Sequence, residues 1–145
     1  MSTPYPIRVT EARDAARDAA AAMGIDATLI SSLVDGFYTH VRADPVLGPI
    51  FDGEIGDEWD EHLAKLKRFW SSIMLHDGSY SGRPMPVHMK LTGLTPEHFQ
   101  TWLTLFEQTL GEIGASEAAQ AHFMDRARRI AQSFQLNIFY DPKQG

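Results

Sequence analysis

Four polar ring side chains fall within apolar stretches of the sequence: Tyr38, His62, His88 and Trp102. Taken singly, each is explained as a core residue bonded to a backbone carbonyl, because a buried ring nitrogen or hydroxyl needs a partner. Taken together, they are the set that a haem pocket uses. One imidazole ligates the iron, and donors on the far side meet a polarised diatomic ligand. Residue chemistry alone leaves both interpretations open.

His88 lies in an irregular segment, residues 76–94, in which no helical period is visible. This segment holds five residues that interrupt helices: Gly78, Gly82, Pro84, Pro86 and Gly93. A loop of this length inside a compact domain is usually functional or disordered. Its apolar content, including Met85 beside His88, favours the first alternative. A histidine braced in this way could present one ring nitrogen to a metal while the other bonds the backbone.

Other metal and catalytic sites fit the sequence less well. The chain has no cysteine, which excludes disulfides, thiolate zinc sites, iron–sulfur clusters and cysteine nucleophiles. It contains neither H-E-x-x-H, nor paired E-x-x-H motifs, nor a G-x-S-x-G elbow. Apolar side chains on the expected inward faces would instead wall a flat apolar cofactor: Phe37, Phe51, Leu66, Phe69, Phe106 and Ile130.

Composition restricts the class of partner. The chain has 145 residues, enough for one domain, and a net charge of -6 without any cluster of Lys and Arg. Nucleic acid is therefore not an expected partner. No apolar run reaches membrane-spanning length, and acidic residues interrupt the alanine-rich start, so we expect neither membrane insertion nor a signal peptide. We expect a cytoplasmic protein, either a monomer or a weak homodimer.

Helical periodicity dominates the chain and no strand pattern occurs, which predicts an all-α fold. The expected helices are 8–23, 27–43, 57–75, 96–112 and 116–139. Gly24 should end the first helix, Asp26 and Asp57 should cap the second and third, and Thr95 should cap the fourth. The run P-V-L-G-P-I-F at 45–51 predicts a tight turn that delivers its last two residues to the core.

Four segments carry a resemblance to a known family. They are F-Y-T-H-V-R-A-D-P-V-L-G-P-I-F (37–51), W-D-E-H-L-A-K-L-K-R-F-W-S-S-I-M-L (59–75), Y-S-G-R-P-M-P-V-H-M-K-L (80–91) and H-F-Q-T-W-L-T-L-F (98–106). In this order they resemble the truncated haemoglobins, and more narrowly the group III branch of that bacterial family. The resemblance covers roughly residues 25–140. It implies a shortened globin fold, a two-over-two helical sandwich, here with an N-terminal helical extension (1–25) before the core (26–140) of a single haem domain (1–145).

The resemblance also implies roles for individual residues. His88 matches the proximal iron ligand, and Tyr38 and Trp102 match distal residues that donate hydrogen bonds to a bound ligand. His62 matches a distal histidine that swings between pocket and solvent, and Phe51 matches a phenylalanine packed on the porphyrin face. The candidates for partners of the haem propionates come from position only: Lys65, Lys67, Arg68, Tyr80, Arg83 and Lys90.

The implied function is that of a haem b protein that binds dioxygen, nitric oxide and, as further candidates, cyanide, sulfide or peroxide. Two distal donors would slow ligand release, which favours scavenging or redox detoxification over delivery. The alternative is a redox enzyme, a nitric oxide dioxygenase or a peroxidase-like protein. Because no G-x-G-x-x-G motif occurs, such an enzyme would need a separate reductase.

Overall fold

The computed structural model describes residues 5–76 and 95–139. These residues form helices and no strand, which confirms the all-α prediction. The helices are α1 (Tyr5–Ala22), α2 (Ala27–Ala43), α3 (Leu47–Ile55), α4 (Trp59–Leu75), α6 (Pro96–Glu112) and α7 (Glu117–Phe139).

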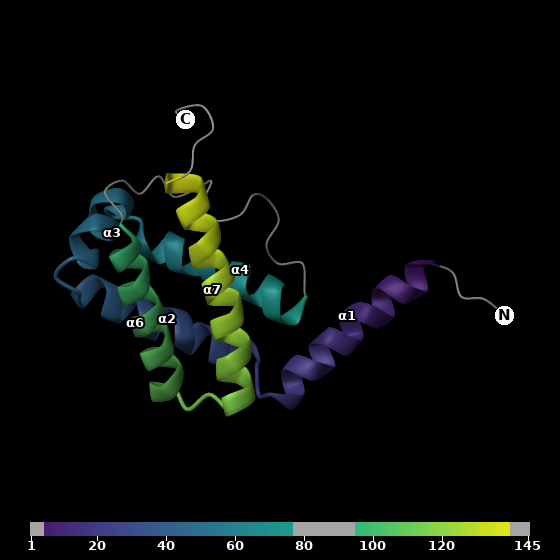
Figure 1. Ribbon diagram of the computed structural model, residues 1–145. Helices are drawn as coiled ribbons and strands as arrows, with labels where there is room; N and C mark the ends of the chain where they lie inside the picture. Colours follow the sequence, from purple (N-terminus) through teal and green to yellow (C-terminus); the bar gives the residue numbers. More distant parts are fainter. Residues whose placement is uncertain (1–4, 77–94, 140–145) are drawn as a thin grey trace.

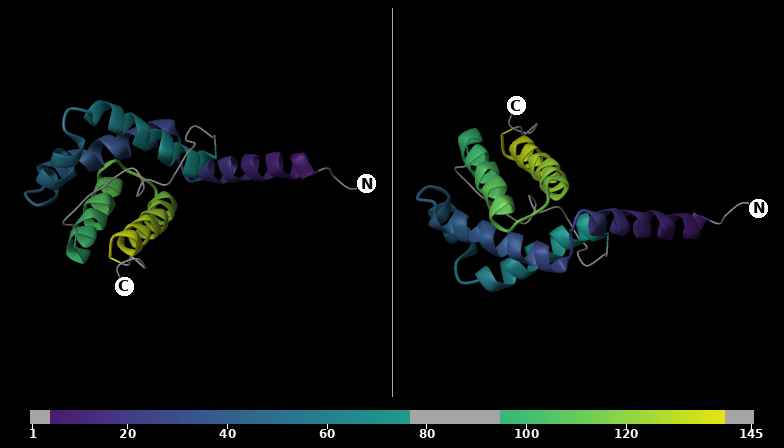
Figure 2. Two further views of the ribbon diagram at one scale, coloured as in Figure 1. Left: turned by 90° about the horizontal axis from the view of Figure 1, so that it is seen from above. Right: turned by 90° about the horizontal axis from the view of Figure 1, so that it is seen from below.

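The helices after α1 form two layers. α2 and α4 lie side by side with α3 at one end, and α6 and α7 form an antiparallel pair that runs across them (Figure 1). The views from above and below show the layers edge-on, with α1 projecting away from both (Figure 2). The arrangement is the expected two-over-two sandwich with a helical extension.

Apolar residues at helical spacing create the core between the layers. α2 buries Ile30, Leu33, Val34, Phe37, Tyr38 and Val41, one continuous stripe at intervals of three and four residues. α2 also approaches α6 closely, because Gly36 has no side chain where α6 places the methyl group of Thr109. A Cβ atom at Gly36 would lie 3.0 Å from that methyl carbon. The core therefore depends on α2 lying close against α6.

Three helix ends match the sequence predictions. Gly24 ends α1 in a left-handed conformation, with φ of 79°. Asp26 caps α2 by accepting the backbone N–H of Leu29 at 2.8 Å. Ser116 precedes α7, where its hydroxyl accepts the N–H of Ala119 at 3.0 Å and donates to the carbonyl of Met23 at 2.8 Å. This last contact ties the start of α7 to the turn between α1 and α2.

The turn predicted at 45–51 occupies only residues 45 and 46, because helix α3 begins at Leu47. Pro49 occupies the first turn of α3, where a missing N–H removes no hydrogen bond. Asp44 starts the helix by accepting the N–H groups of Val46 and Leu47 at 2.9 and 2.8 Å. Phe51 is nevertheless buried, as expected. Helix α3 adds one element to the five that the periodicity predicted.

The start of α4 also differs from the prediction. The helix begins at Trp59 after Glu58, and neither Glu58 nor the expected Asp57 caps it with a side-chain bond. Gly56 has φ of 62° and ends α3 immediately upstream, so the chain turns a corner over residues 56–58 before it can enter α4.

Helix α1 contacts the body at its C-terminal end. Ala20 is buried, and the Arg17 guanidinium donates to the carbonyl of Leu75 at the end of α4 at 3.4 Å. Among the described helices none is by itself long and apolar enough to cross a membrane. The bent pair Asp14–Ala22 and Ala27–Ala43, at 66°, passes that test by length and composition only.

Replacing either of two glycines of α3 by alanine should have opposite effects on the free energy of unfolding. A Cβ atom at Gly48 would overlap the backbone carbonyl oxygen of Arg42, whereas one at Gly53 would meet nothing within 4 Å. We expect Gly48→Ala to lower the free energy of unfolding by about 1–3 kcal/mol, because backbone atoms must move. Gly53→Ala should raise it by about 0.5–1 kcal/mol through helix propensity. Chemical denaturation of the two variants and the parent measures both effects, and equal values for the two variants would contradict the close approach of α3 to α2.

Candidate functional site

Phe37 and Tyr38 are consecutive residues of α2 that face two parts of the same interior. The Phe37 ring packs edge-on against Trp102 and Phe106 of α6, with centroids 5.2 and 5.1 Å apart. Its neighbour Tyr38 lies 4.7 Å away, at 69°. Because successive helical residues are about 100° apart, Phe37 anchors α2 on α6 while Tyr38 points toward the α3–α4 side.

The Tyr38 hydroxyl is buried and forms a side-chain hydrogen bond with Trp102. Trp102 donates this bond, since an indole nitrogen carries a hydrogen and no accessible lone pair. Burial raises the pKa of Tyr38 far above its ordinary value, and the bond from Trp102 offsets only part of that rise. Tyr38 is therefore neutral at physiological pH, with its own hydroxyl hydrogen available for donation.

His62 of α4 adds a third polar group beside this pair. Its ring stands perpendicular to the Tyr38 ring, with centroids 6.3 Å apart. The Nε2 atom is buried and has no hydrogen-bond partner among the described residues. Burial lowers the pKa of His62, and the positive charge of Lys65 on the same helix lowers it further. An unpaired buried ring nitrogen is costly, so this position suits a polar partner that the described residues do not supply.

Besides Phe37, two of the apolar residues proposed as pocket walls contact these polar groups: the Phe51 ring lies 6.1 Å from that of Tyr38, and Phe106 stacks on Trp102 at 5.9 Å between centroids. Phe51, Leu66 and Phe106 are buried. Phe69 and Ile130, with Trp102, are half-buried and pack against the core, so each keeps part of its surface for another contact. Aromatic and aliphatic walls beside a buried tyrosine, an indole and an unpaired imidazole fit the chemistry of haem and of a diatomic ligand.

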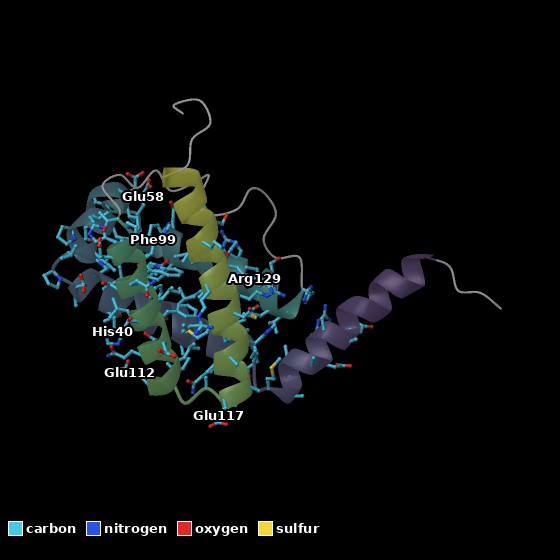
Figure 3. All side chains as sticks on the ribbon, in the orientation of Figure 1. His40, Glu58, Phe99, Glu112, Glu117 and Arg129 are labelled. Carbon is cyan, nitrogen blue, oxygen red and sulfur yellow. The ribbon has the colours of Figure 1, made fainter. Side chains whose placement is uncertain are left out.

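One candidate for the pocket rim already has another partner. Lys67 forms an ion pair of 2.9 Å with Asp35 of α2, so this lysine ties α4 to α2. A second polar contact joins α2 to α6, where His40 bonds Glu112 at 2.7 Å (Figure 3). Proximity of His40 lowers the pKa of Glu112. The His40 contact links the two layers, whereas the Lys67 contact links two helices of one layer, and neither includes Tyr38, His62 or Trp102.

Several of the predicted site residues lie outside the described residues. They are the proposed iron ligand His88 and the proposed pocket and rim residues Tyr80, Arg83, Met85 and Lys90. The structure therefore brings together Tyr38 of α2, His62 of α4 and Trp102 of α6, and the proposed role of His88 stays a prediction.

The sequence analysis missed three residues next to the site. Trp59, assigned only to an apolar helix face, donates its indole N–H to Asp52 at 2.8 Å. Arg42 pairs with Asp52 at 3.3 Å, and its guanidinium carbon lies 4.5 Å from the centroid of the Trp59 ring. No sequence signal indicates this arrangement, because the three residues come from three helices and Asp52 directly follows the segment predicted to be a turn.

The same region forms an open groove of about 400 Å³ between α2, α3 and α4. Tyr38 and Leu63 line it together with polar residues on both sides. The full lining is Asp35, Tyr38, Thr39, Arg42, Ala43, Asp52 and Leu63. The groove brings solvent to the back of the helix segment that carries the buried tyrosine.

A two-over-two helical sandwich with these polar and apolar groups between its layers defines a haem globin of the truncated class. A model of the bacterial-like globin family matches residues 20–136. The chain belongs to this family, whose members are haem proteins that bind small diatomic ligands.

Relatives place the chain more narrowly within the truncated haemoglobins. It is 41% identical over 114 residues to the group 3 truncated hemoglobin ctb of Campylobacter jejuni, covering 77% of this chain and 88% of the relative. The crystal structure of the group III truncated hemoglobin from Campylobacter jejuni superposes with a TM-score of 0.72 and 39% identity, over 80% of this chain and 93% of the other. The group II protein from Bacillus anthracis gives 0.65 and 27%, over 79% and 87%. The family and branch inferred from the sequence are confirmed.

The lowered pKa of His62 predicts a specific dependence of stability on pH. The unfolded chain takes up a proton on this residue as pH falls through its ordinary pKa, about 6.5, whereas the folded chain takes it up only at lower pH. The stability associated with neutral His62 is therefore present above that value and is lost as pH falls toward the folded pKa. His62→Gln should flatten the decrease of Tm between about pH 7 and pH 5.

The matched control is His122→Gln, which removes a half-buried histidine of α7. Thermal unfolding followed by circular dichroism across that pH range compares the three proteins. A His62→Gln curve with the same slope as the parent and the control would show that burial does not disfavour the charged His62.

Proposed function

We propose that this globin holds haem b through His88 and binds dioxygen, nitric oxide and related small ligands on the side of Tyr38, His62 and Trp102. The observation that carries the proposal is the meeting of three polar groups from three helices. Two are hydrogen-bond donors, and the third is a buried Nε2 without a partner among the described residues. The matches of His88 and Tyr38 to the proximal and distal positions of the family support the same assignment.

Within this proposal the walls and the polar groups have separate tasks. The proposed walls surround the macrocycle and exclude water. They are Phe37, Phe51, Leu66, Phe69, Phe106 and Ile130, together with Met85. Tyr80 and Arg83 are the proposed partners of its propionates. Haem iron, when bound, supplies the coordination site for small ligands. Tyr38 donates its free hydroxyl hydrogen to a polarised ligand, and Trp102 donates its indole N–H to the same ligand in place of its bond to Tyr38. Each bond is worth about 1–3 kcal/mol in a buried site.

Two donors at one ligand slow its release, so the proposed role is scavenging or redox detoxification. The alternative is an enzyme, a nitric oxide dioxygenase or a peroxidase-like protein that receives electrons from a separate reductase. Steady turnover with an added electron donor separates the alternatives, because a scavenging protein reacts once for each ligand bound. We further propose one haem domain over 1–145, with a core of 26–140 and an extension of 1–25, in a cytoplasmic monomer or weak homodimer.

Tyr38→Phe tests the contribution of the buried hydroxyl. The substitution removes one donor from a polarised ligand and leaves the aromatic ring, so dioxygen dissociation should become about tenfold faster, equivalent to about 1.4 kcal/mol. Stopped-flow displacement of dioxygen by carbon monoxide measures this rate. Thr39→Ala is the control, because the Thr39 hydroxyl is exposed and bonds only its own helix at the carbonyl of Asp35. An unchanged rate in Tyr38→Phe would remove Tyr38 from the ligand site.

His62→Ala tests whether this side chain controls ligand access. With its unpaired Nε2, His62 has no hydrogen bond from that atom to a described residue, so steric hindrance is its main proposed effect on an arriving ligand. Carbon monoxide association, measured after flash photolysis, should rise by about three- to tenfold, as expected when a gate that is mostly closed is removed. Association at the parent rate would contradict the proposed gate.

A further inference from the structure

Three side chains from three helices form a closed contact at the corner between α3 and α4. The carboxylate oxygen Oδ1 of Asp52 accepts the indole N–H of Trp59 at 2.8 Å and faces the Nε of Arg42 at 3.3 Å. The Arg42 guanidinium carbon also lies 4.5 Å from the Trp59 ring centroid. We call Arg42, Asp52 and Trp59 the Asp52 clamp.

The clamp depends mainly on the bond between Asp52 and Trp59. The side chains of Arg42 and Asp52 are 49% and 47% exposed, and an ion pair that solvent reaches contributes little by itself. Trp59 is only 6% exposed, so its N–H needs a partner inside the protein. A charged acceptor makes this bond stronger than a neutral one would. Loss of the Asp52 carboxylate would therefore release the Trp59 ring.

Trp59 is in turn the side wall of the polar site. Its ring lies 5.9 Å from the rings of both Tyr38 and His62, and it stands perpendicular to the His62 ring at 88°. His62 follows Trp59 by three residues on α4, so their side chains lie next to each other on one face. Because the His62 Nε2 makes no hydrogen bond to a described residue, ring packing against Trp59 and Tyr38 is what restrains its orientation.

We propose that Arg42, Asp52 and Trp59 are positioning residues that hold His62 in place and thereby set the rate at which small ligands reach the site. The inference rests on the proposed function of His62 as the residue that hinders access. The open groove supports it, because Arg42 and Asp52 line the same groove as Tyr38. A rearrangement of the clamp would therefore change both the shape of the groove and the packing around His62.

The first test compares carbon monoxide association after flash photolysis in four proteins. Asp52→Ala should bind about fivefold faster than the parent, as expected for the loss of one hydrogen bond that restrains the gate. Asp52→Asn keeps an oxygen acceptor for Trp59 and should restore a rate near that of the parent. Glu54→Ala removes the same charge from an exposed position of α3 and should leave the rate unchanged. A merely structural role for Asp52 would not produce rescue by asparagine.

The second test asks whether the clamp acts through His62. In a His62→Ala background, Asp52→Ala should produce no additional increase, because the restrained side chain is absent. If the fivefold increase persists in that background, or if it is missing in the parent background, the proposal is overturned.

A third measurement needs no ligand kinetics. Histidine-ring NMR, recorded under dithionite and carbon monoxide to keep any haem diamagnetic, follows the titration of His62. The groups facing His62 are Tyr38 of α2 and Lys65 and Trp59 of α4, and the clamp substitution changes none of them. The pKa of His62 should rise toward its ordinary value in Asp52→Ala, as the ring becomes solvated, and should stay unchanged in Glu54→Ala. Unchanged titration in both variants overturns the clamp. A parent that takes up no carbon monoxide contradicts the proposed function instead, and the NMR titration then decides the clamp by itself.

Discussion

The packing of Phe37 against α6 is the contact on which the rest of the site depends. Its ring meets Trp102 and Phe106 edge-on, at 5.2 and 5.1 Å, and fixes both the rotation and the position of α2 relative to α6. Gly36 permits this close approach, since a side chain there would press on Thr109. With α2 held in this rotation, Tyr38 is buried where the Trp102 N–H can reach its hydroxyl. One apolar contact thus positions the neighbouring polar one.

The polar site lies at the boundary between the two layers. For this reason some of its polar groups have hydrogen-bond partners and one does not. Trp102 donates to the Tyr38 hydroxyl across α2 and α6, which leaves the hydroxyl hydrogen of Tyr38 for another acceptor. His62 comes from α4, on the other side of Tyr38, and its Nε2 has no partner in the described part of the chain. A group left unpaired at a cost to stability is typical of functional sites. In the proposed Asp52 clamp, ring packing restrains this histidine, whose Nε2 makes no hydrogen bond to a described residue.

Periodicity in the sequence was enough to predict most helices, because one buried face repeats along each of them, as from Ile30 to Val41 in α2. Periodicity did not predict α3, because prolines and a glycine in this stretch indicate a turn. Pro49 is nevertheless compatible with a helix, since a proline in the first turn costs no hydrogen bond. The polar set was predicted from residue types and from resemblance to a family. The contact of Trp59 with Asp52 was not predictable, since it closes a corner between two helices and leaves no periodic signal.

We propose that the interior of this globin holds haem with His88 as the iron ligand. The most direct test of this proposal is a visible absorption spectrum of the purified protein titrated with haem, beside His88→Ala and the control His122→Ala. We expect stoichiometric uptake of haem with a strong haem band in the parent and the control, and a lost or altered band in His88→Ala. A band of unchanged shape and intensity in His88→Ala would contradict the assignment of the ligand, and no band in the parent would contradict haem binding itself.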